Sequence, residues 1–405
     1  MIYFLFIVLT LVFSLIYDRE EGYHGVKGIA YAAMCLMLVL IAGLRDGLGG
    51  DTFFYQRNFE YWYEGAMDNE LLSTLRYELT HSGYMPLWSL TNIWLRQYSD
   101  SFVAYQILQA LFVNGVICWV ISRHTDRGFM FLLFYFVLGT FFLFNTEVMR
   151  ESIAIALGLL GIECFTSGHK WAFWLCAALA FGFHISAAVL VIYPFLRIKM
   201  TWATIAWASA AALAVWVVSD ILMSLAVNHG SVLPDFLKLR LEGYSALATN
   251  IKGFARYWLH FMLVPAVLIL YSMQGKISEH EVEWRERMVG LFFPLAIIAA
   301  SIAGFTRFTN YVVVFELLAL AEVARTLLEE QKHLLVRGGA VLAFMVLYAW
   351  SLLEYYPQND FRMYEFYTPY TSVFNKDDVV RSRREVAHWE SCSNDWGDAG
   401  TRTIE

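Results

Sequence analysis

The sequence has little charge. Only 16% of its 405 residues are Asp, Glu, Lys or Arg, whereas 59% are hydrophobic. A soluble globular protein of this length carries more polar surface, so the composition predicts a polytopic membrane protein. The net charge is −7, and the basic residues are scattered through short loops instead of forming a patch. Both observations argue against nucleic acid as a partner.

Cysteine is scarce as well. Four of the five cysteines lie inside apolar runs, where they are typical packing residues, and Cys392 stands alone in the tail. Without a CxxC pair or a His/Cys ligand spacing, the sequence indicates neither a disulfide framework nor a metal site. The glycine-rich run at residues 47–50 lacks the Lys-Ser/Thr sequel of a P-loop. We therefore expect no metal and no cofactor.

Long apolar runs are abundant, and about twelve of them cross or nearly cross a hydrocarbon core of ~30 Å. The fold class predicted is an all-α, polytopic transmembrane helical bundle of about 12 spans. Residues 171–196 are interpreted as two short crossings that meet at His184, because Lys170 and Arg197 then share one side. The expected spans are residues 2–17, 27–44, 101–122, 129–144, 147–166, 171–183, 185–196, 202–222, 257–274, 288–303, 310–328 and 338–355.

The short loops carry basic residues on one face of this arrangement, and the positive-inside rule makes that face cytoplasmic. Residues 1–355 then form the transmembrane domain, with outer loops 45–100 and 223–256. The tail at 356–405 and both termini lie outside. The basic residues of the short loops include Lys27, Arg123, Arg127, Lys170, Arg197, Lys199, Arg287, Arg325 and Arg337.

Four arginines recur at the opposite, outer ends of the spans, namely Arg45, Arg150, Arg256 and Arg307. A planar guanidinium grips phosphate oxygens in a bidentate manner, so a ring of arginines suits a lipid diphosphate at the membrane surface. The alternative is that each arginine only anchors its span at the interface.

The stretch around Arg150 runs from a polar turn straight into an apolar helix. We expect that helix to begin at Asn145 or Thr146, which would cap it and place Arg150 in its first turns. The side-chain charge and the helix N-terminus would then both favour an anion. The alternative is a local salt bridge from Glu147 to Arg150, with Glu151 solvated.

Three further residues are candidates for proton transfer. Asp46 and Asp51 flank the glycine run and are possible general bases or acceptors for sugar hydroxyls, or else ordinary turn caps. His184 breaks an apolar segment near the outer surface, where it is a catalyst or a packing residue. Glu316 lies within a span and is expected to face the bundle interior.

Short motifs along nearly the whole chain resemble the EpsG family of Wzy-type polysaccharide polymerases. Glu151 departs from the family pattern, which often has Gln at that position. The motifs are Arg45-Asp46, Gly50-Asp51-Thr52 with Tyr55, Asn145 with Met149-Arg150-Glu151, Phe183-His184-Ile185-Ser186, Arg307 through Tyr311, and Pro369-Tyr370.

The resemblance implies a membrane-embedded enzyme with a fold like that of GT-C glycan polymerases and ligases. Such an enzyme transfers a growing glycan from undecaprenyl diphosphate to a sugar hydroxyl of an incoming lipid-linked repeat unit. It acts at the periplasmic face of the bacterial inner membrane, without metal, beside a flippase and a chain-length regulator of the same pathway. The alternatives are a glycan ligase and a flippase or transporter for the lipid-linked oligosaccharide.

The residues that match the motifs receive roles on this basis. Catalytic roles fall to His184, Asp51 and Asp46. Diphosphate binding falls to Arg150, Arg307, Arg45 and Arg256, of which Arg256 rests on its place at a span end. Contacts with the substrate fall to Tyr55, Glu147, Glu151, Tyr311 and Tyr370.

Overall fold

The computed structural model describes residues 1–63, 71–79, 84–228, 251–270, 279–330, 346 and 367–376. The all-α prediction is confirmed, because these residues form helices and, outside them, one isolated bridge between Arg45 and Ser372. The long helices are α1 (Ile2–Tyr17), α2 (Gly25–Gly43), α7 (Phe102–His124), α8 (Gly128–Val137), α10 (Met149–Thr166), α11 (Lys170–Phe183), α12 (Trp202–Asn228), α14 (Ile251–Leu270), α15 (Glu279–Ser301) and α16 (Val313–Glu330). The shorter ones are α3 (Thr52–Arg57), α5 (Leu71–Tyr77), α6 (Pro86–Arg96), α9 (Thr140–Phe142), the π-helices η1 (Asn58–Trp62) and η3 (Leu143–Glu147), and the 3-10 helices η4 (Ile185–Ile192) and η6 (Ala303–Tyr311).

Three helices of the described part are long and apolar enough to cross a membrane, and a bent pair adds a fourth. The three are Gly25–Gly43, Phe102–His124 and Trp202–Ser219, and the bent pair is Gly128–Val137 with Thr140–Glu147. The helices Ile2–Tyr17 and Lys170–Phe183 are apolar but shorter. A total of about twelve spans therefore stays a prediction, and the last expected span, at 338–355, lies outside the described residues except for Val346.

Two expected spans differ in form. Residues 129–144 do not make one straight helix, because Gly139 adopts φ +83° and the chain bends by 76° there. The break at His184 is confirmed, but the segment after it is the eight-residue 3-10 helix η4. At a rise of ~2.0 Å per residue, η4 covers only about half of a ~30 Å hydrocarbon core. The helix of this segment is therefore shorter than the expected crossing at 185–196.

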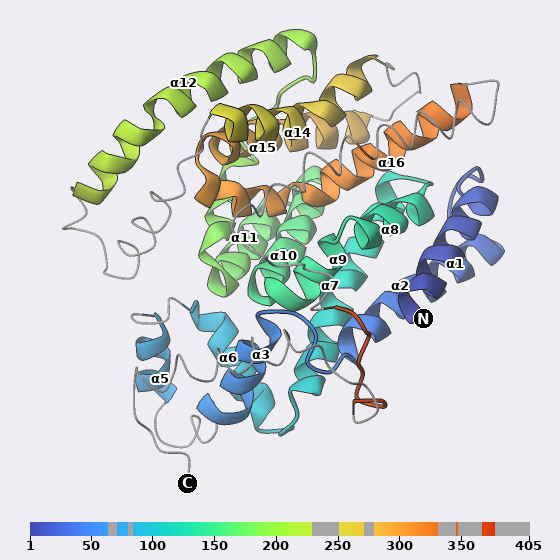
Figure 1. Ribbon diagram of the computed structural model, residues 1–405, viewed down its shortest axis with the longest axis vertical. Coiled ribbons are helices and arrows are strands. Elements are labelled where there is room, and N and C mark those ends of the chain that lie inside the picture. Colours follow the sequence, from blue (N-terminus) through green and yellow to red (C-terminus); the bar gives the residue numbers. More distant parts are fainter. Residues whose placement is uncertain are drawn as a thin grey trace.

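The expected outer loops also have different limits. Residues 45–100 contain α3, α5 and α6, which gather beyond one end of α7, α10 and α11 (Figure 1). The expected loop at 223–256 is shorter, because α12 continues to Asn228 and α14 begins at Ile251. Its centre and most of the tail at 356–405 lie outside the described residues.

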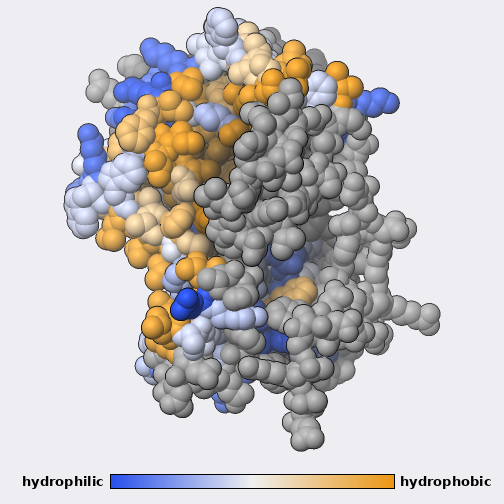
Figure 2. All heavy atoms as spheres, turned by 90° about the vertical axis from the view of Figure 1, so that its left-hand side faces the viewer, coloured by the Kyte–Doolittle hydropathy of each residue, from blue (hydrophilic) through white to orange (hydrophobic). Residues whose placement is uncertain are grey.

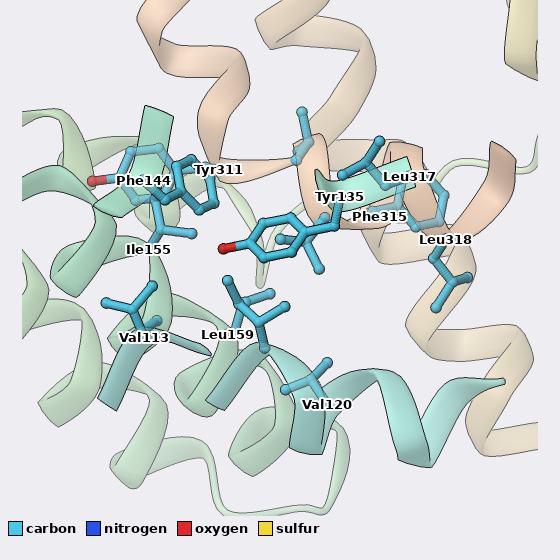
Figure 3. Close-up of a cluster of buried hydrophobic side chains, with 14 of the residues drawn as sticks. Val113, Val120, Tyr135, Phe144, Ile155, Leu159, Tyr311, Phe315, Leu317 and Leu318 are labelled. Carbon is cyan, nitrogen blue, oxygen red and sulfur yellow. The ribbon is translucent and has the colours of Figure 1, made fainter. Parts of the chain in front are cut away.

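Helix α10 is the centre of the bundle, packed against α7, α11 and η4 (Figure 1). Two glycines permit this close packing, since a Cβ on Gly158 would lie 3.0 Å from Leu190 of η4 and one on Gly161 would lie 3.0 Å from Cys176 of α11. Figure 3 shows α10 side chains Ile155 and Leu159 among buried side chains of neighbouring helices. Most residues of α10 are therefore buried.

On the outer helices of the bundle, apolar side chains are exposed and polar side chains are buried, as in a membrane protein. On α1, Thr10 and Ser14 are buried whereas Phe4 is 72% exposed. On α12, Trp207 and Val217 are exposed as well, and Figure 2, viewed from the side of α12, shows hydrophobic residues over much of that face. In water this arrangement would be inverted, so these helices face lipid.

The basic short loops gather at the end of the bundle opposite α3 and α6. Lys27 Nζ donates to the carbonyl of Asp126 (2.8 Å), so the start of α2 meets the loop between α7 and α8. His124 in the last turn of α7 stacks on Trp284 of α15, with ring centroids 3.9 Å apart. Arg197 forms an ion pair with a glutamate two residues further along α15. These basic residues therefore share one end of the molecule, as predicted.

Candidate active site

The helix that carries Arg150 begins later than predicted. Residues 143–147 continue the preceding turn as π-helix η3, and α10 starts at Met149. Asn145 and Thr146 do not cap α10, because their side chains donate to carbonyls four residues earlier at 2.7 Å. Buried Asn114 of α7 also donates to Asn145 (2.9 Å) and holds this turn in place. The predicted side-chain cap is therefore wrong.

Glu147 fixes the glycine-rich loop against the start of α10. Its carboxylate accepts hydrogen bonds from the backbone N–H groups of Gly50 (2.8 Å) and Asp51 (3.1 Å), and from the hydroxyl of Tyr367 (2.6 Å). Gly49 adopts φ +97°, and a Cβ there would lie 2.4 Å from the Thr146 side chain. The glycines therefore allow a close approach of the loop to this turn, and Glu147 acts as a clamp.

Arg150 lies between two tyrosine rings. Its guanidinium carbon is 4.1 Å from the ring centroid of Tyr84 and 5.9 Å from that of Tyr55. The predicted alternative of an ion pair with Glu147 does not form, since Glu147 serves the glycine loop. The Nε of Arg150 is buried without a hydrogen-bond partner among the described residues. Burial raises the pKa of both tyrosines, so neutral hydroxyls flank the cation.

Ser186 joins three segments that are far apart in the sequence. Its Oγ lies 2.6 Å from Nδ1 of His184, 3.0 Å from the hydroxyl of Tyr311 and 3.4 Å from Oε1 of Glu151. Glu151 is only 1% exposed, which corrects the alternative of a solvated carboxylate. The motifs at Arg150-Glu151, at the α11–η4 break and on η6 therefore meet at the Ser186 hydroxyl.

Ser186 itself was not among the residues assigned a role from sequence. The signal that could have identified it is its place two residues after His184, where a polar pair interrupts an apolar run. A serine hydroxyl in such a run needs a hydrogen-bond partner once it is buried. That requirement predicts a contact but not which distant residue supplies it.

Arg307 and Arg150 both interact electrostatically with Glu151. Arg307 is exposed on η6, four residues before Tyr311, whose side chain is buried beside Phe144 in Figure 3. Burial opposes the charge of Glu151, and Arg307, Asn310 and Arg150 offset part of that cost. A carboxylate with two guanidinium groups around it leaves the cluster with a net positive charge, which suits an anionic ligand.

Arg45 does not lie with these arginines. It is 2% exposed, and its guanidinium donates to the carbonyl of Ala42 and to Met149 Sδ. Burial lowers the pKa of Arg45 to about 10, so it remains a cation at neutral pH. An enclosed guanidinium ties the end of α2 to α10 and is poorly placed for a diphosphate. Arg256 lies partly buried on α14, outside the contacts made by Ser186.

The two aspartates and the two outer tyrosines have different surroundings. Asp46 pairs through its backbone N–H with the carbonyl of Thr371 (3.0 Å), and Asp51 is exposed immediately before α3. Tyr55 donates to the carbonyl of Glu147 (3.1 Å). Tyr370 donates to the carbonyl of Ile41 (3.1 Å), so it anchors the segment 367–376 to α2.

Glu316 and His260 form a separate buried pair. Both are buried, and His260 Nε2 lies 3.6 Å from Glu316 Oε1. The prediction that Glu316 faces the bundle interior is confirmed. The pair joins α14 to α16 and is not part of the contacts around Ser186.

The arrangement at the start of α10 can be compared with known families. A model of the EpsG family matches residues 28–372. The chain belongs to the EpsG family. A search of curated proteins and a search of solved structures found no match.

EpsG proteins are membrane proteins resembling Wzy-type and exopolysaccharide polymerases, and membership indicates a polysaccharide polymerase-type function for this chain. Together with the apolar helices, it identifies a membrane protein of polysaccharide biosynthesis. The EpsG match spans every motif gathered around Ser186 as well as the glycine loop clamped by Glu147.

Proposed function

We propose that this protein polymerises lipid-linked repeat units. It transfers a growing glycan from undecaprenyl diphosphate to a sugar hydroxyl of an incoming lipid-linked unit. The observation that supports this is the cluster at one end of the bundle. There Arg150 and Arg307 interact electrostatically with Glu151, and both Glu151 and His184 contact the hydroxyl of Ser186. The cluster combines an anion grip with groups that handle protons.

The reaction separates charge at two points. The bond between the anomeric carbon and the phosphate oxygen breaks, and the diphosphate keeps the electron pair and gains one negative charge. The acceptor oxygen bonds to the anomeric carbon and loses its proton. Cations fixed beside the departing oxygen stabilise this charge where it develops, and we assign that role to Arg150 and Arg307.

Proton removal falls to His184 in this proposal. It is partly exposed, whereas Glu151 behind it is buried, so the imidazole is the group of the cluster that an acceptor sugar can reach. Asp51 is exposed at the edge of the glycine loop and is a second candidate for contacts with sugar hydroxyls. Tyr55 and Tyr84 would hold Arg150 in position for the diphosphate.

The location follows from the two ends of the bundle. Basic loops gather at one end, and the cluster around Ser186 lies at the other. Under the positive-inside rule the basic end is cytoplasmic, so the site faces the periplasm across the bacterial inner membrane. A flippase and a chain-length regulator of the same pathway are the protein partners that this location implies.

The lipid-linked products of a deletion strain test the function. Single repeat units should accumulate without the gene, and the wild-type chain should restore long glycan. Long glycan that stays on its lipid would indicate a ligase, and units trapped on the cytoplasmic side would indicate a flippase. Arg150→Ala should fail to restore polymer at equal protein level. Arg197→Ala is the matched control, because Arg197 lies at the opposite end and is half exposed.

A further inference from the structure

The hydroxyl of Ser186 has more partners than it has hydrogens. Its Oγ carries one hydrogen, and it lies within contact distance of His184 Nδ1, Glu151 Oε1 and the Tyr311 hydroxyl. Tyr311 carries its own hydrogen and can donate it to Ser186. When Tyr311 donates, the Ser186 hydrogen goes either to His184 or to Glu151, and the choice depends on which nitrogen of His184 is protonated.

The two choices correspond to the two neutral forms of the imidazole. When Nδ1 is unprotonated, it accepts from the backbone N–H of Ser186 (3.3 Å) and from the Ser186 hydroxyl (2.6 Å). When Nδ1 carries the proton, it donates to the Ser186 hydroxyl, which then donates to Glu151. In this second form Nε2 is unprotonated and can accept a proton. This second form gives up the hydrogen bond from the Ser186 backbone N–H, because a protonated Nδ1 cannot accept it.

We infer that Ser186 is a positioning residue that couples Glu151 to His184 during proton removal from the acceptor sugar. The inference rests on the proposed polymerase function. His184 takes the acceptor proton at Nε2, its Nδ1–H stays on the Ser186 oxygen, and the Ser186 hydrogen stays on Glu151. The charge of Glu151 thereby stabilises the imidazolium through one hydroxyl. The imidazolium later releases its proton to water, which completes the proton balance.

The burial of Glu151 makes this coupling effective. The carboxylate is 1% exposed, so its charge is screened little by solvent, and Ser186 Oγ contacts both this carboxylate and His184. The charged groups that act on Glu151 from neighbouring elements are Arg307 of η6 and Arg150 of α10 itself. Burial opposes the charge of Glu151, and these two cations offset part of that cost. Its 3.4 Å contact with Ser186 is long, and it should shorten when His184 is charged.

A purely structural role for Ser186 makes different predictions. Ser186 lies at the start of η4, and its backbone N–H is already capped by His184. If the hydroxyl only satisfied local polar groups, its loss would lower the amount of folded protein and leave the turnover of the folded fraction unchanged. If it couples Glu151 to His184, its loss lowers kcat with little change in KM.

The experiment uses the purified full-length protein in lipid nanodiscs, with an undecaprenyl-diphosphate-linked repeat unit as substrate. Ser186→Ala and Glu151→Gln should each lower kcat by about 10- to 100-fold, part of the effect of general base catalysis. Ser186→Thr keeps a hydroxyl and should recover most of the activity. The double variant should be no slower than the slower single variant, because both changes break one chain of contacts.

The matched control is Ser219→Ala, which removes another buried serine hydroxyl, bonded within α12 to the carbonyl of Trp216 (2.7 Å). It should keep wild-type kcat. Two results would overturn the coupling: wild-type kcat in Ser186→Ala, or rate losses that multiply in the double variant. If the wild-type protein itself does not extend the lipid-linked unit, the proposed function fails instead, so the two failures are distinguishable.

Discussion

Arg150 is the residue on which the diphosphate assignment depends most. Lysine keeps the charge but loses the planar fork and the stacking on Tyr84, so Arg150→Lys should impair turnover and Arg150→Ala should nearly abolish it. A charge-assisted contact is worth ~1.5–3 kcal/mol, so its loss should slow turnover by roughly one to two orders of magnitude. Initial rates of purified variants on lipid-linked repeat units measure this. Near-normal turnover by Arg150→Ala would contradict the assignment.

For single residues, the sequence was a better guide to the end of the bundle at which a side chain lies than to the depth of its burial. Glu151 and His184 were expected near the outer surface, and the structure brings both of them, with Tyr311, around Ser186. Arg45 was placed with them for the same reason, yet it is enclosed. A position at a helix end fixes the level of a residue in the bundle but not the direction of its side chain, which depends on contacts across the fold.

The glycine-rich loop is the element whose packing can be tested most directly. At Gly49 an alanine would need an unfavourable φ of +97° and would collide with Thr146, since its Cβ would lie 2.4 Å away. A left-handed backbone costs a non-glycine residue ~1–2 kcal/mol, and overpacking adds ~1–3 kcal/mol. Gly49→Ala should therefore lower the Tm of the purified protein more than Gly168→Ala does.

Gly168 is the matched control because it also has a positive φ, +88°, but has open space around it. Equal Tm losses in the two variants would mean that only the backbone conformation matters and that the loop does not pack tightly on the turn before α10. The activity of the Gly49 variant should fall with its stability, since Glu147 clamps the same loop.

Two short helices, η4 and η3, show why local sequence patterns did not predict every helix type. The break at His184 was predicted because polar residues interrupt an apolar run, but the 3-10 geometry of η4 was not, since a short run that is apolar throughout has no periodicity to identify its helix type. The π-helix η3 was not predicted either, for a different reason. Asn145 resembles a helix cap locally, yet its side chain is held by Asn114 of α7, a residue that only the fold brings near.

Across the whole molecule, the two ends of the bundle predict opposite membrane sides. The segment 367–376 packs on the end of α2 near the site through Tyr370, whereas the turn at Gly168 between α10 and α11 lies at the other end of α10. A reporter fused after Asn375 should therefore be active outside the cytoplasm, and one inserted at Gly168 should report the cytoplasm. The insertion keeps the full chain and serves as the internal control. A cytoplasmic signal after Asn375 would invert the topology and move the proposed site to the wrong side for periplasmic polymerisation.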